Sequence, residues 1–343
     1  MVSNIKISPV GFAVIFIISG CIVLYTQRVW RYQSFEMKST PEQISLKELL
    51  SVSIEMAEKG GLEVVQVMNE KKLNEKSKGE TKEGANNPVT DGDIRSHRIM
   101  THGMKKAFPN LKVISEEHET LKWDESEVKM PKMNRDEVKS ITGDTVISAG
   151  DITVWIDPLD ATQEYTEELL QYVTTMVCVA VKGDPIIGVI HKPFLSNGQK
   201  TKWAWLDMAK SNGLEKPKER ADQASNPKII VSRSHKGEVE TVAHKSFGET
   251  TEVIPAGGAG YKVLSLYDGT ADAYIHTTLI KKWDICAGDA ILRASHEQMT
   301  NLKGELINYE HKAPGDEKNE HGLLASLHDH QLFLEKLEAV VKA

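Results

Sequence analysis

The sequence predicts a layered sandwich of the α/β or α+β class, and three observations lead to this fold class. Helix-like and strand-like apolar patterns mix along nearly the whole chain, as expected when helices cover sheets. Several apolar runs with strand character follow one another between residues 152 and 206. The 343 residues are 40% hydrophobic and contain no internal repeat, so the chain can build one large core or two smaller ones.

The first element expected is a membrane anchor at residues 7–25, after a short tail at 1–6. Its nineteen uncharged residues would span close to 30 Å as a helix, which is about one bilayer core. A signal peptide would have a shorter apolar core and a small-residue cleavage site, of which "SGC" is a poor version. We therefore expect an uncleaved anchor followed by a polar stem at residues 26–44.

The charges near this anchor bear on its orientation. Arg28 and Arg31 follow the apolar run, whereas only Lys6 and the α-amine precede it. The positive-inside rule alone would then place the body of the protein in the cytoplasm. No N-x-S/T sequon occurs in the chain to favour the lumen.

The body is expected to begin at residue 45 with a helical pattern that is interrupted at Gly60-Gly61. A charged loop at 74–88 precedes a second helix, 91–108, which starts with aspartates suited to a cap. A short strand, 111–117, ends in Glu116 and Glu117. Residues 119–150 are charged and irregular, and we expect them to leave the main fold as an excursion.

Strand patterns dominate the next part of the chain. The run "ITVWID" leads into a helical turn, two apolar strands flank a Lys-Gly-Asp-Pro turn within 172–194, and "KWAWL" forms a further strand. The polar segment 206–227 marks a boundary between two halves of the domain, predicted as 45–210 and 226–343. In the second half, strand and helix patterns again alternate. We expect strands at 228–231, 271–278 and 322–327 and helices at 284–295 and 332–343.

Charge and cysteine content limit the partners. The net charge is −7 and no basic cluster occurs, which argues against a nucleic-acid-binding protein. The three cysteines, Cys21, Cys178 and Cys286, are too few to predict a disulfide framework. Cys178 and Cys286 lie in apolar or helical patterns and are expected to be small core residues, so they leave the redox compartment open.

Paired acidic residues carry the main functional signal. In "WIDPLDATQEY", Asp157 and Asp160 lie three residues apart around a proline. Carboxylates are preferred ligands of Mg²⁺, and metal ions held close together can stabilise an in-line phosphoryl displacement. Free N–H groups at Ala161 and Thr162, at the start of a helix, would suit a phosphate. The alternatives are structural: Asp93 and Asp284 as helix caps, and Glu116 as a surface charge.

The motifs "VISEE", "WIDPLDAT" and "WDICAGDAIL" resemble the lithium-sensitive, magnesium-dependent phosphatases of the inositol monophosphatase superfamily, over roughly residues 45–343. This resemblance implies an αβαβα sandwich of the type shared with fructose-1,6-bisphosphatases. It implies two or three Mg²⁺ ions and inhibition by Li⁺. It also implies that Asp93 pairs with Thr162 to activate the attacking water, and that Ala161 stands where the family usually has glycine. The implied metal ligands are Glu116, Asp157, Asp160, Asp284 and the carbonyl of Leu159.

Further segments, "DPLDATQEYTE", "KKWD", "SRSH" and "GGAGYK", resemble the bisphosphate-nucleotidase branch of that superfamily. That branch implies hydrolysis of adenosine 3′,5′-bisphosphate, a by-product of sulfotransferases, to AMP and phosphate. On their own, the glycine-rich run is typical of a flexible turn and a histidine after a strand is typical of a structural residue. The implied substrate-binding residues are Ala161, Ser232, Ser234, His235, Gly258, Gly260 and Lys262.

The anchor resembles that of Golgi members of the branch, which implies a single-pass type II protein in the Golgi membrane with a lumenal catalytic domain. Two alternatives remain at this stage: an inositol phosphate phosphatase on the same scaffold, and a membrane-tethered binding protein without activity. All the expected acids and Thr162 are present, which favours an enzyme. The oligomeric state cannot be read from the sequence.

Overall fold

The computed structural model describes residues 20, 22–28, 42–80, 84, 86–118, 128–234 and 238–341. The chain divides into two units, Met1–Glu42 and Gln43–Ala343. In the first unit, residue 20 and residues 22–28 are helical, and the side chains from Ile22 to Tyr25 are exposed. The end of the predicted stem, residues 42–44, is also described, and Gln43 and Ile44 already belong to the first strand of the second unit, so this unit begins before the predicted boundary at residue 45. The rest of the predicted anchor and stem lies outside the described residues. Within the part of the chain that is described, no helix has the length and apolar character needed to cross a membrane.

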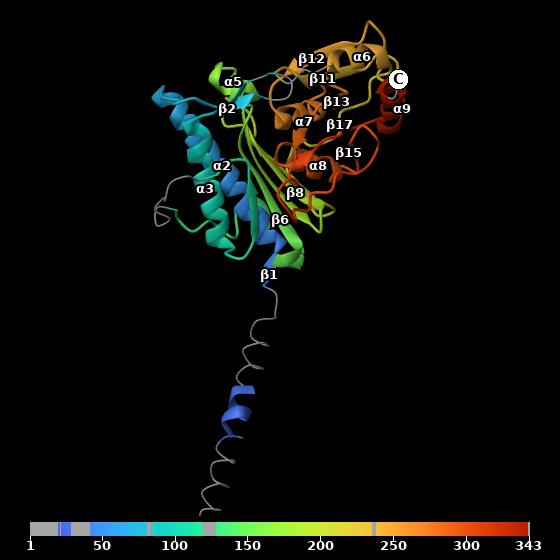
Figure 1. The fold of residues 1–343 in the computed structure, drawn as a ribbon. Coiled ribbons are helices and arrows are strands. Elements are labelled where there is room, and N and C mark those ends of the chain that lie inside the picture. The colour runs from blue at the N-terminus through green and yellow to red at the C-terminus, as the bar shows by residue number, and fades with distance from the viewer. Residues whose placement is uncertain are drawn as a thin grey trace, which may run out of the picture. The chain divides into compact units, whose positions relative to one another are not determined.

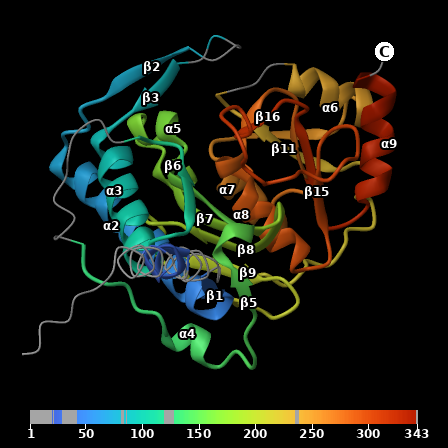
Figure 2. The same cartoon turned by 60° about the horizontal axis from the view of Figure 1, so that its bottom comes forward.

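The second unit is built as five layers in the order helix, sheet, helix, sheet, helix (Figures 1 and 2). The first sheet has the strand order β10-β9-β8-β7-β6-β4 and the second has the order β12-β11-β13-β17-β15. The strands of the first sheet are β4 (Lys112–Ser115), β6 (Ile152–Asp160), β7 (Thr174–Val181), β8 (Asp184–His191), β9 (Thr201–Trp205) and β10 (Ala209–Lys210). Those of the second are β11 (Lys228–Ser232), β12 (Glu252–Ala256), β13 (Ala273–His276), β15 (Gln298–Thr300) and β17 (Leu323–Ser326).

Helices cover both faces of each sheet. The outer layer on the first sheet is α2 (Leu46–Glu70) with α3 (Asp91–Ala107), and the layer between the sheets is α7 (Ala259–Tyr267) with α8 (Lys282–Arg293). The outer layer on the second sheet is α6 (Val239–Phe247) with α9 (His330–Val341). The αβαβα sandwich implied by the family resemblance is therefore the fold of this unit.

Side chains of the first sheet pack into a core on each of its two faces. Val154 and Ile156 of β6 pack in the core beneath α2 and α3, whereas Trp155 packs in the core with α7 and α8. Successive side chains of a strand point to opposite faces, so one apolar strand can serve two cores. The nine residues of β6 are all buried, and "ITVWID" accordingly has only two polar residues, Thr153 and Asp157.

The helix α2 runs without a break through Gly60-Gly61, where the sequence pattern had suggested an interruption. A Cβ atom at Gly60 would lie 2.6 Å from Ser96 Oγ of α3, and one at Gly61 would lie 2.5 Å from the ring of His191. The two glycines allow α2 to approach both neighbours closely, so their role is packing within a helix.

The remaining elements are short and lie mostly at edges. Two small antiparallel pairs involve residues of the predicted loop 74–88 and of the predicted excursion 119–150, and a third joins two segments of the second half. The excursion is described only from residue 128 onward. These elements are β1 (Gln43–Ser45) with β5 (Val146–Ser148), β2 (Lys76–Glu80) with β3 (Asn86–Val89), β14 (Ile280–Lys281) with β16 (Lys318–Asn319), and the helices α4 (Asp136–Lys139) and α5 (Thr162–Thr166).

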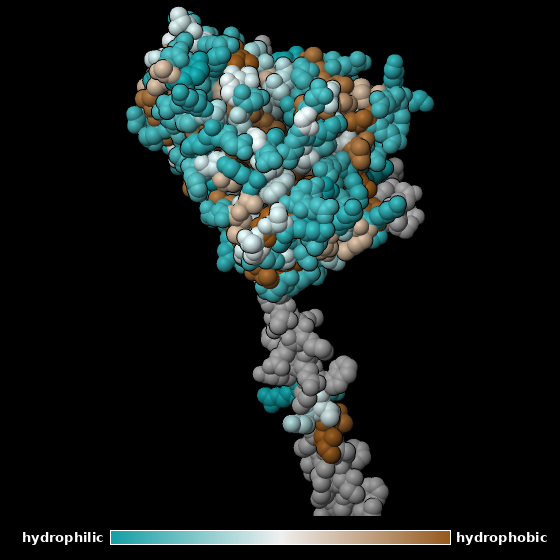
Figure 3. Space-filling model, turned by 180° about the vertical axis from the view of Figure 1, so that it is seen from behind, coloured by the Kyte–Doolittle hydropathy of each residue, from teal (hydrophilic) through white to brown (hydrophobic). Residues whose placement is uncertain are grey.

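The surface seen in Figure 3 is mostly hydrophilic, with apolar side chains interspersed. Among the described residues of the second unit, the large apolar side chains that are exposed come from well-separated parts of the chain. Scattered apolar residues of this kind are usual on soluble surfaces. They are Leu62, Met130, Val146, Met208, Leu306 and Leu332.

Cys178 and Cys286 form a disulfide bond, which corrects the expectation that both are free core cysteines. They are indeed buried, but the bond joins β7 of the first sheet to α8 across a sequence separation of 108 residues. Sequence spacing alone could not reveal it, because only the packing of α8 on the sheet brings the two Cα atoms to 5.7 Å.

Removing this disulfide is expected to destabilise the second unit. Cys286→Ala should lower the free energy of unfolding by about 2–5 kcal/mol, because the bond restricts a long loop of the unfolded chain. Urea unfolding followed by circular dichroism measures the change. Cys178→Ala should give a similar loss, and the double variant should lose little more than either single one. An unfolding midpoint that neither the substitutions nor a reductant shifts would contradict the bond.

Candidate active site

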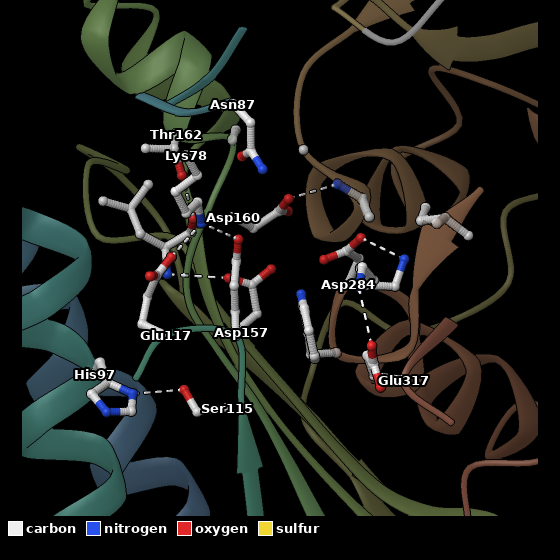
Figure 4. A pocket seen from close by; sticks show the side chains of 18 of the residues that line it. Lys78, Asn87, His97, Ser115, Glu117, Asp157, Asp160, Thr162, Asp284 and Glu317 are labelled. Carbon is white, nitrogen blue, oxygen red and sulfur yellow. Dashed lines mark hydrogen bonds and ion pairs between the residues drawn. The ribbon is translucent and has the colours of Figure 1, made fainter. Parts of the chain in front are cut away.

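A pocket of about 980 Å³ opens where the first sheet meets the layer of α7 and α8 (Figure 4). Its walls come from the ends of β4 and β6, the starts of α5, α7 and α8, and the ends of β11 and β13. Acidic side chains from the first half, including Asp157 and Glu117, face Asp284 of the second half across this space. The pocket thus joins the two halves that the sequence predicted.

Three predicted metal ligands meet in the pocket. Glu116, Asp157 and Asp284 each offer an oxygen, and these oxygens lie within 4.8 Å of one another. Glu116 directly follows β4, whose parallel pairing with β6 sets Ser115 beside Ile156 and so brings the two next residues together. Asp284 lies in the first turn of α8, where one of its oxygens accepts a hydrogen bond from Lys281 N at 3.0 Å. The predicted cap and the predicted ligand are thus the same residue.

The carboxylates of this cluster repel one another in a buried setting. Burial raises the pKa of Asp157 well above its ordinary value, and the charges of Glu116, Asp160 and Asp284 raise it further. Burial likewise raises the pKa of Asp284, helped by the charge of Glu116. A divalent cation would relieve this repulsion, and a set of carboxylate oxygens suits a hard cation such as Mg²⁺. The residues present therefore fit a metal site.

Asp160 is not one of the three carboxylates whose oxygens lie within 4.8 Å of one another, although its charge acts on Asp157 and Asp284. A bulge in the pairing of β6 with β7 separates Asp157 from Asp160, and such a bulge redirects side chains. Both oxygens of Asp160 accept backbone hydrogen bonds at the start of α7, from Ala259 N at 3.0 Å and Gly260 N at 2.9 Å. Thr174 Oγ1 adds a third bond at 3.0 Å. In this structure Asp160 binds the start of α7, and its role as a metal ligand stays a prediction.

Asp93 and Thr162 are in contact, as expected from the resemblance. Thr162 Oγ1 lies 2.9 Å from Asp93 Oδ1 and 3.1 Å from the carbonyl oxygen of Leu159. The other oxygen of Asp93 accepts bonds from the backbone N–H and the hydroxyl of Thr90, so Asp93 also completes the cap of α3. Burial raises the pKa of Asp93 to about 7 in spite of these bonds. Asp93 can therefore cap α3 with one oxygen and accept a hydrogen bond from Thr162 with the other.

Ala161 connects the two aspartates to α5 in a left-handed conformation, with φ of 72° and ψ of 45°. An alanine is strained in this region, where glycine is not, and glycine is the residue usual in the resembling family. The turn before it is held from α3, because Ser96 Oγ donates to the Pro158 carbonyl at 2.6 Å. The surroundings thus impose the conformation on Ala161.

Lys78 and Glu117 belong to the site but were not among the predicted site residues. Lys78 Nζ, from β2, contacts Glu116 Oε1 at 2.8 Å and Glu117 Oε1 at 2.5 Å. Burial alone would lower the pKa of Lys78, but the charges of both glutamates raise it above its ordinary value. Glu117 could have been suspected as the neighbour of Glu116. Nothing in the lysine-rich loop 74–88 distinguishes Lys78 from the other lysines.

The predicted substrate-binding residues divide into three groups. Ser232, Ser234, Gly258, Ala161 and Lys262 line the pocket. Gly260 is not among the lining residues, since its N–H binds Asp160 and a Cβ there would lie 2.6 Å from Thr174 Oγ1. His235 lies outside the described residues.

Lys262 is buried and already has partners. Its Nζ donates to the carbonyl oxygen of Gly258 at 2.6 Å and to that of Ala256 at 3.3 Å. Burial lowers its pKa to about 8, against the opposing charges of Asp160 and Glu164. Lys262 thus holds the loop before α7, and its predicted contact with the far phosphate of a substrate stays a prediction.

The buried acids predict how stability depends on pH when metal is removed. Asp93, Asp157 and Asp284 have raised pKa values, so the folded protein holds protons that the unfolded chain loses. Without metal, the free energy of unfolding should therefore fall as pH rises from about 4 to 7, with Asp93 alone contributing at most about 4 kcal/mol. Chemical unfolding in EDTA at several pH values measures this slope.

Three comparisons make that test specific. Mg²⁺ should flatten the slope because it favours the ionised acids, and Asp93→Asn should flatten it in EDTA. Substitution of the exposed Glu240 by glutamine should leave the slope unchanged. A slope that is the same with Mg²⁺ and with EDTA would speak against a metal site among these acids.

Curated relatives resemble the chain over nearly its whole length. It is 48% identical over 345 residues to "Inositol monophosphatase 3" of Danio rerio, covering 97% of this chain and 96% of that protein. It is 46% identical over 363 residues to the "Golgi-resident adenosine 3′,5′-bisphosphate 3′-phosphatase" of Mus musculus, covering 99% and 98%. Two different activities therefore appear in the names of relatives at similar identity.

Solved structures share the fold at lower identity. The extragenic suppressor protein suhB of Bartonella henselae aligns with a TM-score of 0.63 and 16% identity, covering 85% of this chain and 99% of that chain. The family model described as "Inositol monophosphatase family" matches residues 45–342, the whole predicted phosphatase domain except its last residue. Together with the near full-length relatives, this match shows that the chain belongs to the inositol monophosphatase family of phosphatases.

Proposed function

We propose that this protein is a Mg²⁺-dependent phosphatase that removes the 3′-phosphate of adenosine 3′,5′-bisphosphate, yielding AMP and phosphate. The observation that carries the proposal is the extent of the pocket. One cavity of about 980 Å³ reaches from the acidic cluster to the Ser232–Ser234 segment and Gly258, and that volume suits a nucleotide. The mouse relative named for this reaction adds support.

Glu116, Asp157 and Asp284 would hold the metal, with Asp160 and the Leu159 carbonyl as further predicted ligands. When bound, Mg²⁺ would supply positive charge that stabilises the phosphoryl oxygens as negative charge develops on them. The N–H groups of Ala161 and Thr162 would bind a phosphate oxygen, since the start of a helix has N–H groups without backbone partners.

Thr162 and Asp93 would activate the attacking water. The Thr162 hydroxyl donates its proton toward Asp93 Oδ1, so its lone pairs remain able to accept a hydrogen bond from that water. As the water attacks phosphorus, its proton passes to Thr162 Oγ1 and the threonine proton passes to Asp93. The bond from phosphorus to the 3′ oxygen breaks, and that oxygen takes a proton from solvent to become the 3′-hydroxyl of AMP. A carboxyl whose pKa is near neutrality suits this transfer.

An inositol phosphate phosphatase is the second candidate, because a relative at 48% identity carries the name inositol monophosphatase 3. The acidic cluster and Thr162 serve either reaction equally well. The wall formed by the Ser232–Ser234 segment and Gly258 favours the nucleotide, since it offers hydroxyl groups and close backbone approach to a flat base. A binding protein without activity is the least favoured, because the Asp93–Thr162 contact and the acidic cluster are both in place.

A substrate panel tests the proposal. Residues 33–343 should release phosphate from adenosine 3′,5′-bisphosphate in Mg²⁺ at least tenfold faster, as kcat/KM, than from inositol 1-phosphate. Asp157→Asn should remain folded and lose most of this activity, because a neutral amide is a poor ligand for Mg²⁺. Li⁺ should inhibit the wild type. A preference for inositol phosphates would overturn the proposed substrate, and near-normal turnover by Asp157→Asn would overturn the metal assignment.

We also propose that the protein lies in the Golgi membrane with this domain in the lumen. The buried disulfide supports an oxidising compartment, since cytosolic thiols are generally kept reduced. Relatives named Golgi-resident support the same compartment. Arg28 and Arg31 favour the opposite orientation by charge alone, so the proposal needs a direct test.

A new glycosylation acceptor reports the orientation. Gln199→Thr completes an Asn-x-Thr acceptor at the exposed Asn197, in the loop between β8 and β9. In cells, the full-length variant should gain a glycan that an endoglycosidase removes, because acceptors are modified only in the lumen. Gln199→Ala is the matched control and should gain none. Absence of the glycan at this site and at a second exposed loop would favour a cytoplasmic domain.

A further inference from the structure

Arg233 connects the two halves of the domain beside the pocket. Its Nε donates to Glu164 Oε1 at 3.2 Å, and a terminal nitrogen forms an ion pair with Glu167. Glu164 lies in α5, the short helix that begins at Thr162, and Glu167 directly follows it, whereas Arg233 directly follows β11 in the second half. This arginine therefore ties the loop after β11 to the segment that carries Thr162.

Glu164 is built into this arrangement. Its side chain is 2% exposed, and it packs against Gly257, where a Cβ would lie 2.5 Å from Glu164 Cδ. A buried carboxylate needs a charged or hydrogen-bonding partner, and Arg233 provides both. Glu167 is 38% exposed and binds the guanidinium of Arg233 from the solvent side.

The Ser232–Ser234 segment is also held through the backbone of Arg233. Arg233 N donates to the Ala256 carbonyl at 3.1 Å, at the end of β12 and just before the Gly257–Gly258 loop. Ser232 and Ser234 on either side line the pocket, whereas Arg233 itself is not among the lining residues. Arg233 thus does not line the cavity that its two neighbours help to form, but it binds Glu164, which does line it.

We propose that Arg233 is a positioning residue, which acts through Glu164 and Glu167 to hold the Ser232–Ser234 turn in place for the nucleoside part of the substrate. This inference rests on the proposed function. A loop that is ordered before binding avoids the entropy cost of ordering it on binding, so affinity rises without any contact to the ligand. The planar guanidinium suits the task because it can engage two carboxylates at once.

The expected signature is a change in nucleotide binding with the chemical step preserved. Arg233→Gln should raise KM for adenosine 3′,5′-bisphosphate on the order of tenfold, comparable to losing one charge-assisted hydrogen bond, with kcat changed less than about twofold. The inhibition constant of AMP should rise in parallel. That of inorganic phosphate should stay constant, since phosphate binds at the acidic end of the pocket.

Glu167→Ala separates positioning from direct contact. If Arg233 acts by positioning, loss of this exposed partner should also raise KM for the bisphosphate and the inhibition constant of AMP. If the guanidinium instead meets the substrate, freeing it from Glu167 should lower both constants, and that result would overturn the inference.

Arg220→Gln is the matched control. Arg220 lies in the segment between the two halves, its side chain is 33% exposed against 32% for Arg233, and it binds Asp272 of the second half at 2.8 Å, and neither of these two residues lines the pocket. The variant Arg220→Gln should change thermal stability as much as Arg233→Gln does, without changing KM for the bisphosphate. If both variants give the same KM as the wild type, the inference is wrong although the proposed function stands. If the wild type itself fails to hydrolyse the bisphosphate, the proposed function is wrong.

Discussion

Repulsion among buried carboxylates is the constraint on which the site depends. The parallel pairing of β4 with β6 brings Glu116 beside Asp157, and the packing of α8 on the first sheet adds Asp284. The negative charge of each carboxylate opposes ionisation of its neighbours, as the raised pKa values of Asp157 and Asp284 indicate. The fold offers only partial relief, through Lys78 and the backbone N–H groups near each acid. A divalent cation is the natural complement of the charge that remains.

The second half of the domain is held against this cluster by several independent ties. The disulfide links β7 to α8, Asp160 binds the start of α7, and Arg233 joins the loop after β11 to Glu164. Each tie links a residue of the first half to a residue of the second. The pocket geometry therefore depends on polar and covalent contacts between the halves as well as on the apolar core between the sheets.

The sequence predicted the layered fold and most of the acidic cluster, because both have local signatures. The apolar start of β6 and the "DPLD" turn can be recognised in isolation, and the resemblance supplied the layer order. What it missed depends on tertiary contacts. The pairing of Cys178 with Cys286 requires α8 on the sheet, and the contact of Lys78 with Glu116 requires β2 to return to the end of β4. The hydrogen bonds of Asp160 to the start of α7 likewise depend on a tertiary contact, beyond the bulge in β6, and its role as a metal ligand stays a prediction.

The location of a bound metal tests the central claim most directly. Crystals of the second unit grown with Mn²⁺ should show an anomalous-scattering peak within ligand distance of carboxylate oxygens of Glu116, Asp157 and Asp284, and Lys78 Nζ should have moved away from Glu116. The same map decides whether Asp160 remains on the start of α7 or turns to the ion. A peak elsewhere in the protein, or no peak at these three residues at millimolar Mn²⁺, would contradict the claim that their mutual repulsion is relieved by a divalent cation.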